Sequence, residues 1–398
     1  MFNILLSKKQ QAIRAAILDV IYTQRPISRI DIAKKTGITP ATISAVTGEL
    51  ITEGLLSEIG ELETQNKAGR KKVLLELCEA SSYYLGAEIS EAFLAFVLTD
   101  NLGNIIQQKY LPLNCNGHSD NFLTEHFIAE LRDFITQAKF PLTAIGIALP
   151  GNFDPASDSR ILTNNCFWQD FDLKAIKNAF DTPVFFANNV NCMALKTRIF
   201  QPLADNFIFL NVGRGIRCAY MYQGDIFSKN NFLIGELGHL VVSPEGELCE
   251  CGKRGCLQTY ASETWIIKKA KLLYQKTTNT YLHQLVTNEN ELTLETVISA
   301  YLLGDTSVVL LLNTALNALA ITIANLNLLV DAKHIFIHGK LFDNSQMRAL
   351  LQNYLRNDHQ LLPESHERNF VVESYDRLAG ALGGCALCIS NMLLNKND

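Results

Sequence analysis

Apolar residues recur at helical spacing near the N-terminus, and this pattern predicts a helix over about residues 8–23. Its apolar positions are Ala12, Ile13, Ala16, Ile17, Val20 and Ile21. Ser28, which follows Pro26, is a suitable N-cap for a short second helix. The inward face of that second helix would carry Ile30, Ile32 and Ala33.

A third helix is predicted after the tight turn "TGIT", residues 36–39, in which Gly37 can adopt a positive φ. Thr39 would cap this helix, and Pro40 would occupy its first position, where the missing N–H costs nothing. Ile43, Val46 and Leu50 recur at i, i+3 and i+7 and are expected to be buried. The outward face would then hold small and polar residues, namely Ala41, Thr42, Ser44, Ala45 and Thr47.

The following segment, "LLSEIGELETQNKAGRKKVLLEL", predicts a strand, a polar tip and a second strand, which is typical of a wing. A small, polar helix face fits closely into a major groove, and a basic wing tip can reach the DNA backbone or a narrow minor groove. The alternative is a three-helix packing module that does not contact DNA. The predicted DNA contacts are Thr39, Ala41, Thr42, Ser44, Thr47, Arg70 and Lys71.

Strands and helices alternate along the chain from about Tyr83 onward. "AIGIALPG", "PVFFANN", "NFIFLNVGRG" and "HIFIHG" are each predicted to contain a buried strand. The alternation indicates an α/β body with a mixed sheet in each of two lobes and a cleft between them.

Length and charge refine this division. A chain of 398 residues exceeds the size of one ordinary core, so it is expected to form several domains. The net charge is −5, but residues 1–72 carry +4 and the remainder carries −9, which favours a polyanion as partner of the first part. Lys8 and Lys9 interrupt the apolar N-terminus, and residues 315–330 contain asparagines, so we expect a cytoplasmic protein.

Three cysteines lie close together in "CECGKRGC", residues 249–256, and His239 precedes the first of them by ten positions. Three thiolates and one imidazole form a closed tetrahedral zinc set, which predicts a structural metal site held by His239, Cys249, Cys251 and Cys256. A disulfide between Cys249 and Cys251 would close a small strained ring, and an iron–sulfur cluster normally requires four thiolates.

Two segments resemble the ROK family. "ISRIDIAKKTGITPATISAVTGELITEGLLSEIGE…AGRKK" is similar to the DNA-binding domain of ROK repressors, the group that includes the xylose and N-acetylglucosamine repressors. "GELGHLVVSPEGELCECGKRGCLQTYAS" is similar to the ROK body, which also occurs in ATP-dependent sugar kinases.

This resemblance implies an α/β fold in which a winged helix-turn-helix precedes a two-lobed actin/hexokinase-like (ribonuclease H-like) body. The winged helix-turn-helix would span residues 1–78. The first lobe would comprise 79–195 together with a C-terminal helix at 378–398. The second lobe, 196–377, would carry the zinc motif and an oligomerisation surface.

The resemblance also identifies the positions that a sugar kinase would use. Asn189 stands where the family has the catalytic Asp, and an amide is not a useful general base. "EISEA" at residues 88–92 and "GRGIRCA" at residues 213–219 replace the two glycine-rich phosphate loops. We therefore expect no catalytic activity.

The positions that bind sugar in the family are better preserved, although Gln258 replaces a Glu. Carboxylates, amides and an imidazole suit a polyol because each can bond one or two hydroxyl groups. The resemblance implies sugar contacts from Asn165, Asn188, Asn189, Glu236, His239 and Gln258.

Together these features predict a transcriptional repressor of sugar uptake or catabolism genes, with structural Zn²⁺, operator DNA and a sugar or sugar-phosphate effector as ligands. A homodimer or homotetramer is expected. Two alternatives stay open at this point: a bifunctional sugar kinase with a DNA-binding arm, and a repressor that is relieved by a protein partner.

Overall fold

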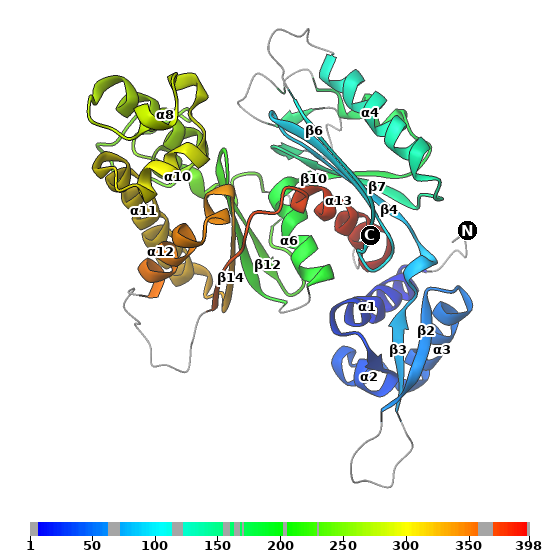
Figure 1. The fold of residues 1–398 in the computed structure, drawn as a ribbon. Helices are drawn as coiled ribbons and strands as arrows, with labels where there is room; N and C mark the ends of the chain where they lie inside the picture. The colour runs from blue at the N-terminus through cyan, green and yellow to red at the C-terminus, as the bar shows by residue number, and fades with distance from the viewer. Residues whose placement is uncertain are drawn as a thin grey trace. The chain divides into compact units, whose positions relative to one another are not determined.

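The structure, a computed structural model, shows a chain that packs as two compact units (Figure 1). The first unit consists of residues 1–203 and 377–398, and the second of residues 204–376. The described residues are 7–62, 72–113, 122–153, 160–162, 168, 171–201, 205–228, 231–356 and 369–395.

The first unit begins with three helices and a small antiparallel sheet of strand order β1-β3-β2. Ser7 caps the first helix, Ser28 the second and Thr39 the third, each by accepting a hydrogen bond from a backbone N–H three residues later. Gly37 ends α2 at a φ of 69°, a left-handed conformation that favours glycine. The elements are α1 (Lys8–Gln24), β1 (Ile27–Ser28), α2 (Arg29–Thr36), α3 (Pro40–Thr52), β2 (Leu56–Leu62) and β3 (Lys72–Leu77).

A five-stranded sheet of order β10-β7-β4-β5-β6 follows in the same unit. The three strands β4, β5 and β6 pair antiparallel, whereas β7 and β10 run parallel to β4. Phe96, Phe127 and Phe134 are fully buried and pack together in the core of this sheet. The strands are β4 (Tyr84–Ile89), β5 (Phe93–Thr99), β6 (Ile105–Pro112), β7 (Ala144–Leu149) and β10 (Val184–Asn188).

The C-terminal helix α13 (Ala379–Ile389) packs directly on this sheet, where glycines permit a close approach. A Cβ atom on Gly86 of β4 would lie 1.8 Å from the carbonyl oxygen of Ala381, and one on Gly146 of β7 would lie 1.9 Å from that of Gly384. Any side chain at either position would therefore push α13 off the sheet. The remaining elements of this unit are η1 (Glu79–Ser81), α4 (Phe122–Ala138), β8 (Asn152–Phe153), β9 (Ile161–Leu162), α5 (Leu173–Asn178), α6 (Asn189–Phe200) and η7 (Ser390–Leu394).

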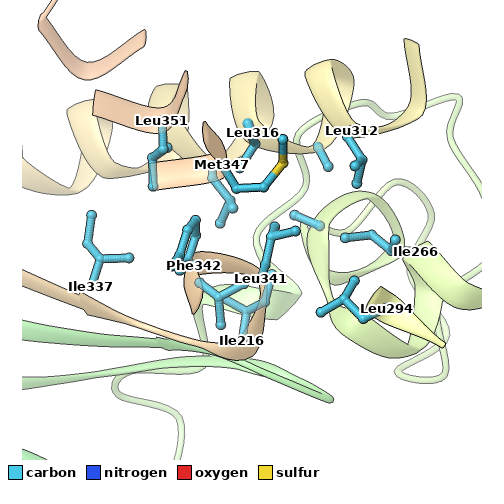
Figure 2. Packing of buried hydrophobic residues seen from close by; sticks show 14 of the residues in the cluster. Ile216, Ile266, Leu294, Leu312, Leu316, Ile337, Leu341, Phe342, Met347 and Leu351 are labelled. Atoms are coloured by element: carbon cyan, nitrogen blue, oxygen red, sulfur yellow. The ribbon is translucent and has the colours of Figure 1, made fainter. Parts of the chain in front are cut away.

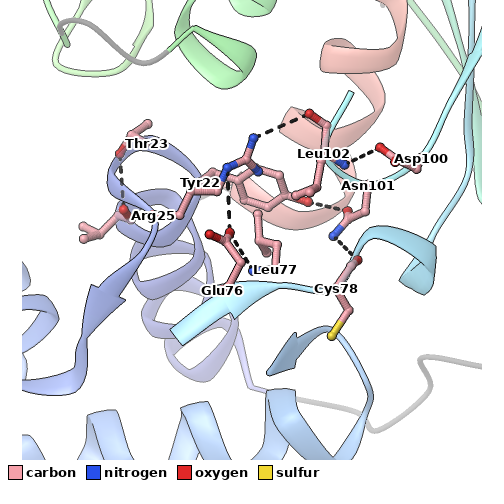
Figure 3. Close-up of polar contacts among 10 residues, drawn as sticks. Tyr22, Thr23, Arg25, Glu76, Leu77, Cys78, Asp100, Asn101 and Leu102 are labelled. Carbon is pink, nitrogen blue, oxygen red and sulfur yellow. Dashed lines mark hydrogen bonds and ion pairs between the residues drawn. The ribbon is translucent and has the colours of Figure 1, made fainter. Parts of the chain in front are cut away.

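Polar side chains join α1 to the sheet part of the first unit (Figure 3). Tyr22 of α1 is fully buried and donates its hydroxyl to Oδ1 of Asn101, while Nδ2 of Asn101 donates to the carbonyl of Cys78 at 3.3 Å. Asp19, one turn earlier on α1, pairs with Arg198 of α6 at 2.7 Å, and both residues are buried. We call these contacts the α1 junction.

The second unit contains a sheet of order β13-β12-β11-β14-β15, in which β14 and β15 run parallel to β11. When the strands of each five-stranded sheet are numbered along the chain, both have the order 3-2-1-4-5. This repetition confirms the two lobes that the sequence pattern predicts and the ribonuclease H-like fold that the family resemblance implies. The strands are β11 (Phe207–Val212), β12 (Ile216–Tyr222), β13 (Asp225–Ile226), β14 (His334–His338) and β15 (Asn369–Val372).

Helices cover this sheet and enclose an apolar core, in which Phe342, Leu316 and Met347 are fully buried (Figure 2). The long helix α11 is long and apolar enough to cross a membrane, but nine of its residues are buried within the unit, as expected of a core helix. The helices are η3 (Leu237–His239), α7 (Gln258–Ala261), α8 (Glu263–Lys276), α9 (Leu282–Leu285), η4 (Glu289–Glu291), α10 (Leu294–Leu302), α11 (Thr306–Val330), η5 (Lys340–Asp343) and α12 (Ser345–Arg356).

Candidate metal centre and the surrounding sites

A compact loop between η3 and α7 brings His239 and the three cysteines together. Its two arms pair at Val241 with Cys256 and at Leu248 with Arg254. Gly255 has a φ of 65°, and a Cβ atom there would lie 1.5 Å from the carbonyl oxygen of Ser243. Only glycine fits this position, and the resulting fold-back carries Cys256 toward Cys249 and Cys251.

The four side chains offer one ligand atom each, and these atoms all lie within 4.8 Å of one another. Sγ of Cys251 is 3.6 Å from Sγ of Cys256, and Sγ of Cys249 is 3.6 Å from Nδ1 of His239. Zinc bound tetrahedrally at about 2.3 Å to sulfur and about 2.05 Å to nitrogen would separate two sulfurs by about 3.8 Å and sulfur from nitrogen by about 3.6 Å. The donor set and its spacing therefore fit a divalent metal of this size.

The protonation of the thiols differs within the cluster. Burial, together with the neighbouring thiols of Cys251 and Cys249, raises the pKa of Cys256 to about 12. Burial also acts to raise the pKa of Cys251, but hydrogen bonds from the Lys253 backbone and from the neighbouring thiols outweigh it and lower that pKa. Because a metal binds thiolates, its binding to this loop has to release protons.

Other polar side chains surround the cluster. Gln258, which is buried, donates from Nε2 to Sγ of Cys249 at 3.3 Å, and Lys253 donates to the carbonyl of His239 at 2.9 Å. The Glu236 carboxylate, which precedes His239 by three residues, forms an ion pair with Arg217 of β12. Burial lowers the pKa of Arg217. Arg217 belongs to the segment that replaces the second phosphate loop, and the sequence alone does not indicate this pairing.

Two predicted sugar contacts lie in the first unit at the start of α6. Oδ1 of Asn188 accepts from the Val190 N–H at 2.9 Å and caps the helix, and its Nδ2 donates to the carbonyl of Gly151 at 3.2 Å. Asn189 directs Nδ2 to the buried carboxylate of Glu88 at 3.5 Å. Asn165 lies outside the described residues.

The segment that replaces the second phosphate loop packs against the beginning of α8. The backbone N–H of Glu263 donates to the carbonyl of Gly213 at 2.8 Å, and the Thr264 hydroxyl donates to that of Arg214 at 3.1 Å. Burial raises the pKa of Glu263. Lys268 and Lys271 line a surface pocket of about 360 Å³ together with Arg214, Glu263 and Thr264.

The helix α3 displays most of the predicted outward face. Thr39, Ala41 and Ser44 are exposed, and the hydroxyls of Thr39 and the half-buried Thr42 lie 2.9 Å apart. Ala45 is exposed as well. Arg70 and Lys71 of the predicted wing tip lie outside the described residues.

The prediction for Thr47 is wrong, because this residue is fully buried. Its Oγ1 accepts a hydrogen bond from Nε of Arg29 at 2.9 Å and donates to the carbonyl of Ile43 at 2.8 Å. Ile43, Thr47 and Leu50 form the buried stripe of α3, so the helix is rotated slightly from the orientation expected, and Val46 is only half-buried. The prediction that Ile30 faces inward is also wrong, since it is 54% exposed.

The comparisons with known proteins agree with this architecture. The family model described as the ROK family matches residues 84–391. The xylose repressor of Bacillus subtilis (strain 168) is 27% identical over 393 residues, which cover 95% of this chain and 94% of that protein. The N-acetylglucosamine repressor of Escherichia coli O157:H7 is 28% identical over 260 residues, or 63% of each chain.

Two solved structures share the fold. A ROK family transcriptional regulator described as a homologue of the E. coli MLC protein has a TM-score of 0.76 and 23% identity, with 96% of both chains covered. A ROK family glucokinase from Streptomyces griseus, solved with glucose and AMPPNP, has a TM-score of 0.64 and 20% identity, with 77% of this chain and 99% of that chain covered. Because the family model spans more than half of its length, this chain belongs to the ROK family.

Proposed function

We propose that this protein is a DNA-binding transcriptional repressor of sugar uptake or catabolism genes and that a sugar or sugar phosphate releases it from its operator. The observation that carries the proposal is the exposed face of α3, which consists of small and polar residues. The helix α3 is the second helix of a helix-turn-helix, the one that enters the major groove in such domains. The xylose repressor, which this chain matches along almost all of its length, supports the same function.

The DNA contacts that we propose come from Thr39, Ala41, Thr42 and Ser44 on α3. Their small side chains let the helix approach base edges closely, and their hydroxyl and methyl groups can contact bases and phosphates. Arg70 and Lys71 remain predicted backbone or minor-groove contacts. Thr47 takes no part, because its hydroxyl is used inside the domain.

The effector contacts that we propose are Asn165, Asn188, Asn189, Glu236, His239 and Gln258. The helix α6 offers a route for the signal within the first unit. It begins at Asn189, and its last turn carries Arg198, which pairs with Asp19 of α1. A ligand that binds more tightly to one position of the start of α6 would favour that position. Through the pairing of Arg198 with Asp19, it would also shift the conformational equilibrium of the DNA-binding helices.

We propose that the chain does not act as a kinase. The amide of Asn189 would stand at the position of the catalytic base, and it is already directed at Glu88. A coupled assay of ATP-dependent phosphorylation, run over hexoses, pentoses and N-acetyl sugars beside a ROK glucokinase, tests this. Turnover comparable to that of the glucokinase would establish the kinase alternative.

We further propose that the His239 cluster holds Zn²⁺, which would join the two arms of the loop without entering any reaction. Four protein ligands fill a tetrahedral shell and leave no open position for a substrate. Cys251→Ser should reduce the zinc content of purified protein well below one per chain and increase proteolysis within the loop. A wild-type chain without stoichiometric zinc by elemental analysis would contradict the assignment.

A homodimer is proposed because an operator with two half-sites requires two DNA-binding domains. Leu310, Ile321 and Leu328 are exposed on α11, and their spacing of eleven and seven residues places them on one face. The 25 residues of α11 contain no charged side chain, which is unusual for a face left in water. Leu310→Asp should shift the mass measured by light scattering to that of a monomer, whereas Leu272→Asp on the exposed face of α8 should not.

Operator binding gives the direct test of the main proposal. Genomic fragments enriched on the protein would be measured by fluorescence anisotropy at several salt concentrations and with a panel of sugars and sugar phosphates. We expect sequence-specific binding that one class of sugar weakens. Absence of any preferred sequence would refute the repressor function, and preferred binding that no sugar affects would favour release by a protein partner.

A further inference from the structure

Gln258 lies at the first position of α7, two residues after the last cysteine of the metal cluster. Its side chain is only 8% exposed, and Nε2 lies 3.3 Å from Sγ of Cys249, which is itself buried. The other end of the amide faces the backbone of η3, because a Cβ atom built on Gly238 would lie 3.1 Å from Oε1. The side chain is therefore held between the metal loop and η3.

The orientation of this amide follows from the chemistry of its neighbour. A thiolate accepts hydrogen bonds, so the amide end that faces it has to be the NH₂ group, since an oxygen would place two acceptors in contact. Three thiolates carry −3, and a divalent metal leaves −1 on the cluster, so a hydrogen-bond donor at the sulfur stabilises the charge. A carboxylate at position 258 would instead repel it.

We infer that Gln258 is a positioning residue of the metal centre, whose amide donates to the Cys249 thiolate, fixes that sulfur and strengthens metal binding. The inference rests on the proposed metal site and is independent of DNA binding. Groups that hold metal ligands in place from outside the coordination shell commonly change metal affinity about 10- to 100-fold when they are removed.

The inference also changes the part that Gln258 can take in effector binding. With its N–H group used at sulfur, the side chain retains only Oε1 for a hydroxyl group of a ligand. The replacement of Glu by Gln at this position then has a physical consequence at the metal, and it need not indicate a loss of effector binding.

The test compares three variants of the full chain. Gln258→Met keeps the length of the side chain without the donor, and Gln258→Glu places a carboxylate against the sulfur. Thr259→Val is the matched control, because Thr259 is the next residue of α7, is fully buried, and donates its hydroxyl at 2.8 Å to the carbonyl of Cys256 instead of to a thiol sulfur. Zinc affinity would be measured by competition with a chromophoric chelator at one pH.

We expect Gln258→Met to weaken zinc binding about 10-fold or more. Gln258→Glu should weaken it further, and Thr259→Val should change it much less than Gln258→Met does. With Co²⁺ in place of zinc, the thiolate-to-cobalt absorption band should shift in Gln258→Met and stay unchanged in Thr259→Val. Circular dichroism would verify that each variant is folded.

Two results would contradict the inference, and they differ from failure of the metal site itself. Zinc affinity of Gln258→Met equal to that of the wild type would refute the donor role, and so would an equal loss in Thr259→Val. If the wild-type chain binds no zinc at all, both the metal assignment and the proposed role of Gln258 are wrong.

Discussion

The α1 junction in the first unit and the apolar core of the second unit stabilise the chain in different ways. The core consists of aliphatic and aromatic side chains such as Phe342 and Leu316 (Figure 2). The junction buries an ion pair between Asp19 and Arg198. It also buries a hydrogen bond between Tyr22 and Asn101 (Figure 3). Apolar contacts in the core need no particular orientation to exclude water. The junction, in contrast, requires each hydrogen-bond donor to meet its acceptor.

This difference separates stability from positioning. Hydrophobic burial is non-directional and grows with area, so a core tolerates small shifts of its parts. A buried ion pair gains little over a hydrophobic contact, because desolvation opposes the attraction, but a single lost partner is strongly unfavourable. The junction is therefore suited to hold α1 in one place, which a repressor needs if its DNA-binding helices are to keep a defined position.

The largest effect is expected in the core. Phe342→Ala should destabilise the second unit by about 3–5 kcal/mol, because the loss of the ring leaves a cavity among well-packed neighbours. Urea unfolding followed by the fluorescence of Trp265 in a Trp168→Phe background would report on this unit alone. Leu272→Ala, at an exposed position of α8, should change the free energy of unfolding by less than about 0.5 kcal/mol.

Arg198→Ala should come next, because it leaves the buried Asp19 carboxylate without this partner. Removal of one member of a buried pair costs about 3–5 kcal/mol when the charge stays buried. Here α1 can separate from α6, and water then hydrates the Asp19 carboxylate. The loss of stability should therefore not exceed the free energy with which α1 packs on α6. Amide hydrogen exchange of α1 should accelerate, and the double variant Asp19→Ala, Arg198→Ala should recover part of the protection.

Arg14→Ala is the control for that comparison. Arg14 pairs with Glu53 within the DNA-binding domain and does not contact the sheet part of the unit through this pair. Its removal should leave the exchange of α1 nearly unchanged. If Arg14→Ala and Arg198→Ala accelerated exchange equally, the distinction between the junction and an ordinary surface pair would be lost.

A smaller effect is expected for Tyr22→Phe, which removes the donor to Asn101 and keeps the ring. Burial raises the pKa of Tyr22 well above its usual range, so the hydroxyl remains a donor at every pH at which the protein is folded. The buried Asn101 oxygen would lose this bond, which should cost about 1–2 kcal/mol. Differential scanning calorimetry of the first unit would show a lower Tm, and no change would mean that water replaces the hydroxyl.

How much of this could be predicted from the sequence depends on the range over which each contact forms. The metal ligands were predicted because three of them lie within eight residues, and a glycine-rich loop brings such neighbours together whatever surrounds them. The helices of the N-terminal domain were predicted from caps such as Ser28 and Thr39, which act over three residues.

Contacts that depend on how elements cross could not be predicted. The period of α3 allowed either Val46 or Thr47 to face inward, and the choice is made by Arg29, which reaches Thr47 from α2. The pairing of Arg217 with Glu236 likewise depends on the position of β12 beside η3. Asn188 illustrates a further limit, since a residue assigned to a sugar also caps α6, and sequence cannot show that its side chain is already engaged.

The smallest effect concerns a polar contact that is partly open to water. Asp31 of α2 accepts hydrogen bonds from the hydroxyl of Ser28 at 2.6 Å and from Lys72 of β3 at 3.0 Å. These contacts, the Ser28 hydroxyl first and Lys72 second, lower the pKa of Asp31. The carboxylate therefore stabilises the folded state fully above its unfolded pKa of about 3.9, and this contribution is lost as the pH falls through the folded value.

Because about a third of the Asp31 side chain is exposed, its contribution should stay below about 1 kcal/mol. Asp31→Asn should lower the stability of the DNA-binding domain at pH 7, and the difference from the wild type should shrink below pH 4. A difference that persists at low pH would mean that the Ser28 bond matters through geometry and not through charge. In that case the contact would act like the α1 junction, whose role depends on the placement of its groups, and not like an exposed ion pair, whose role depends on charge.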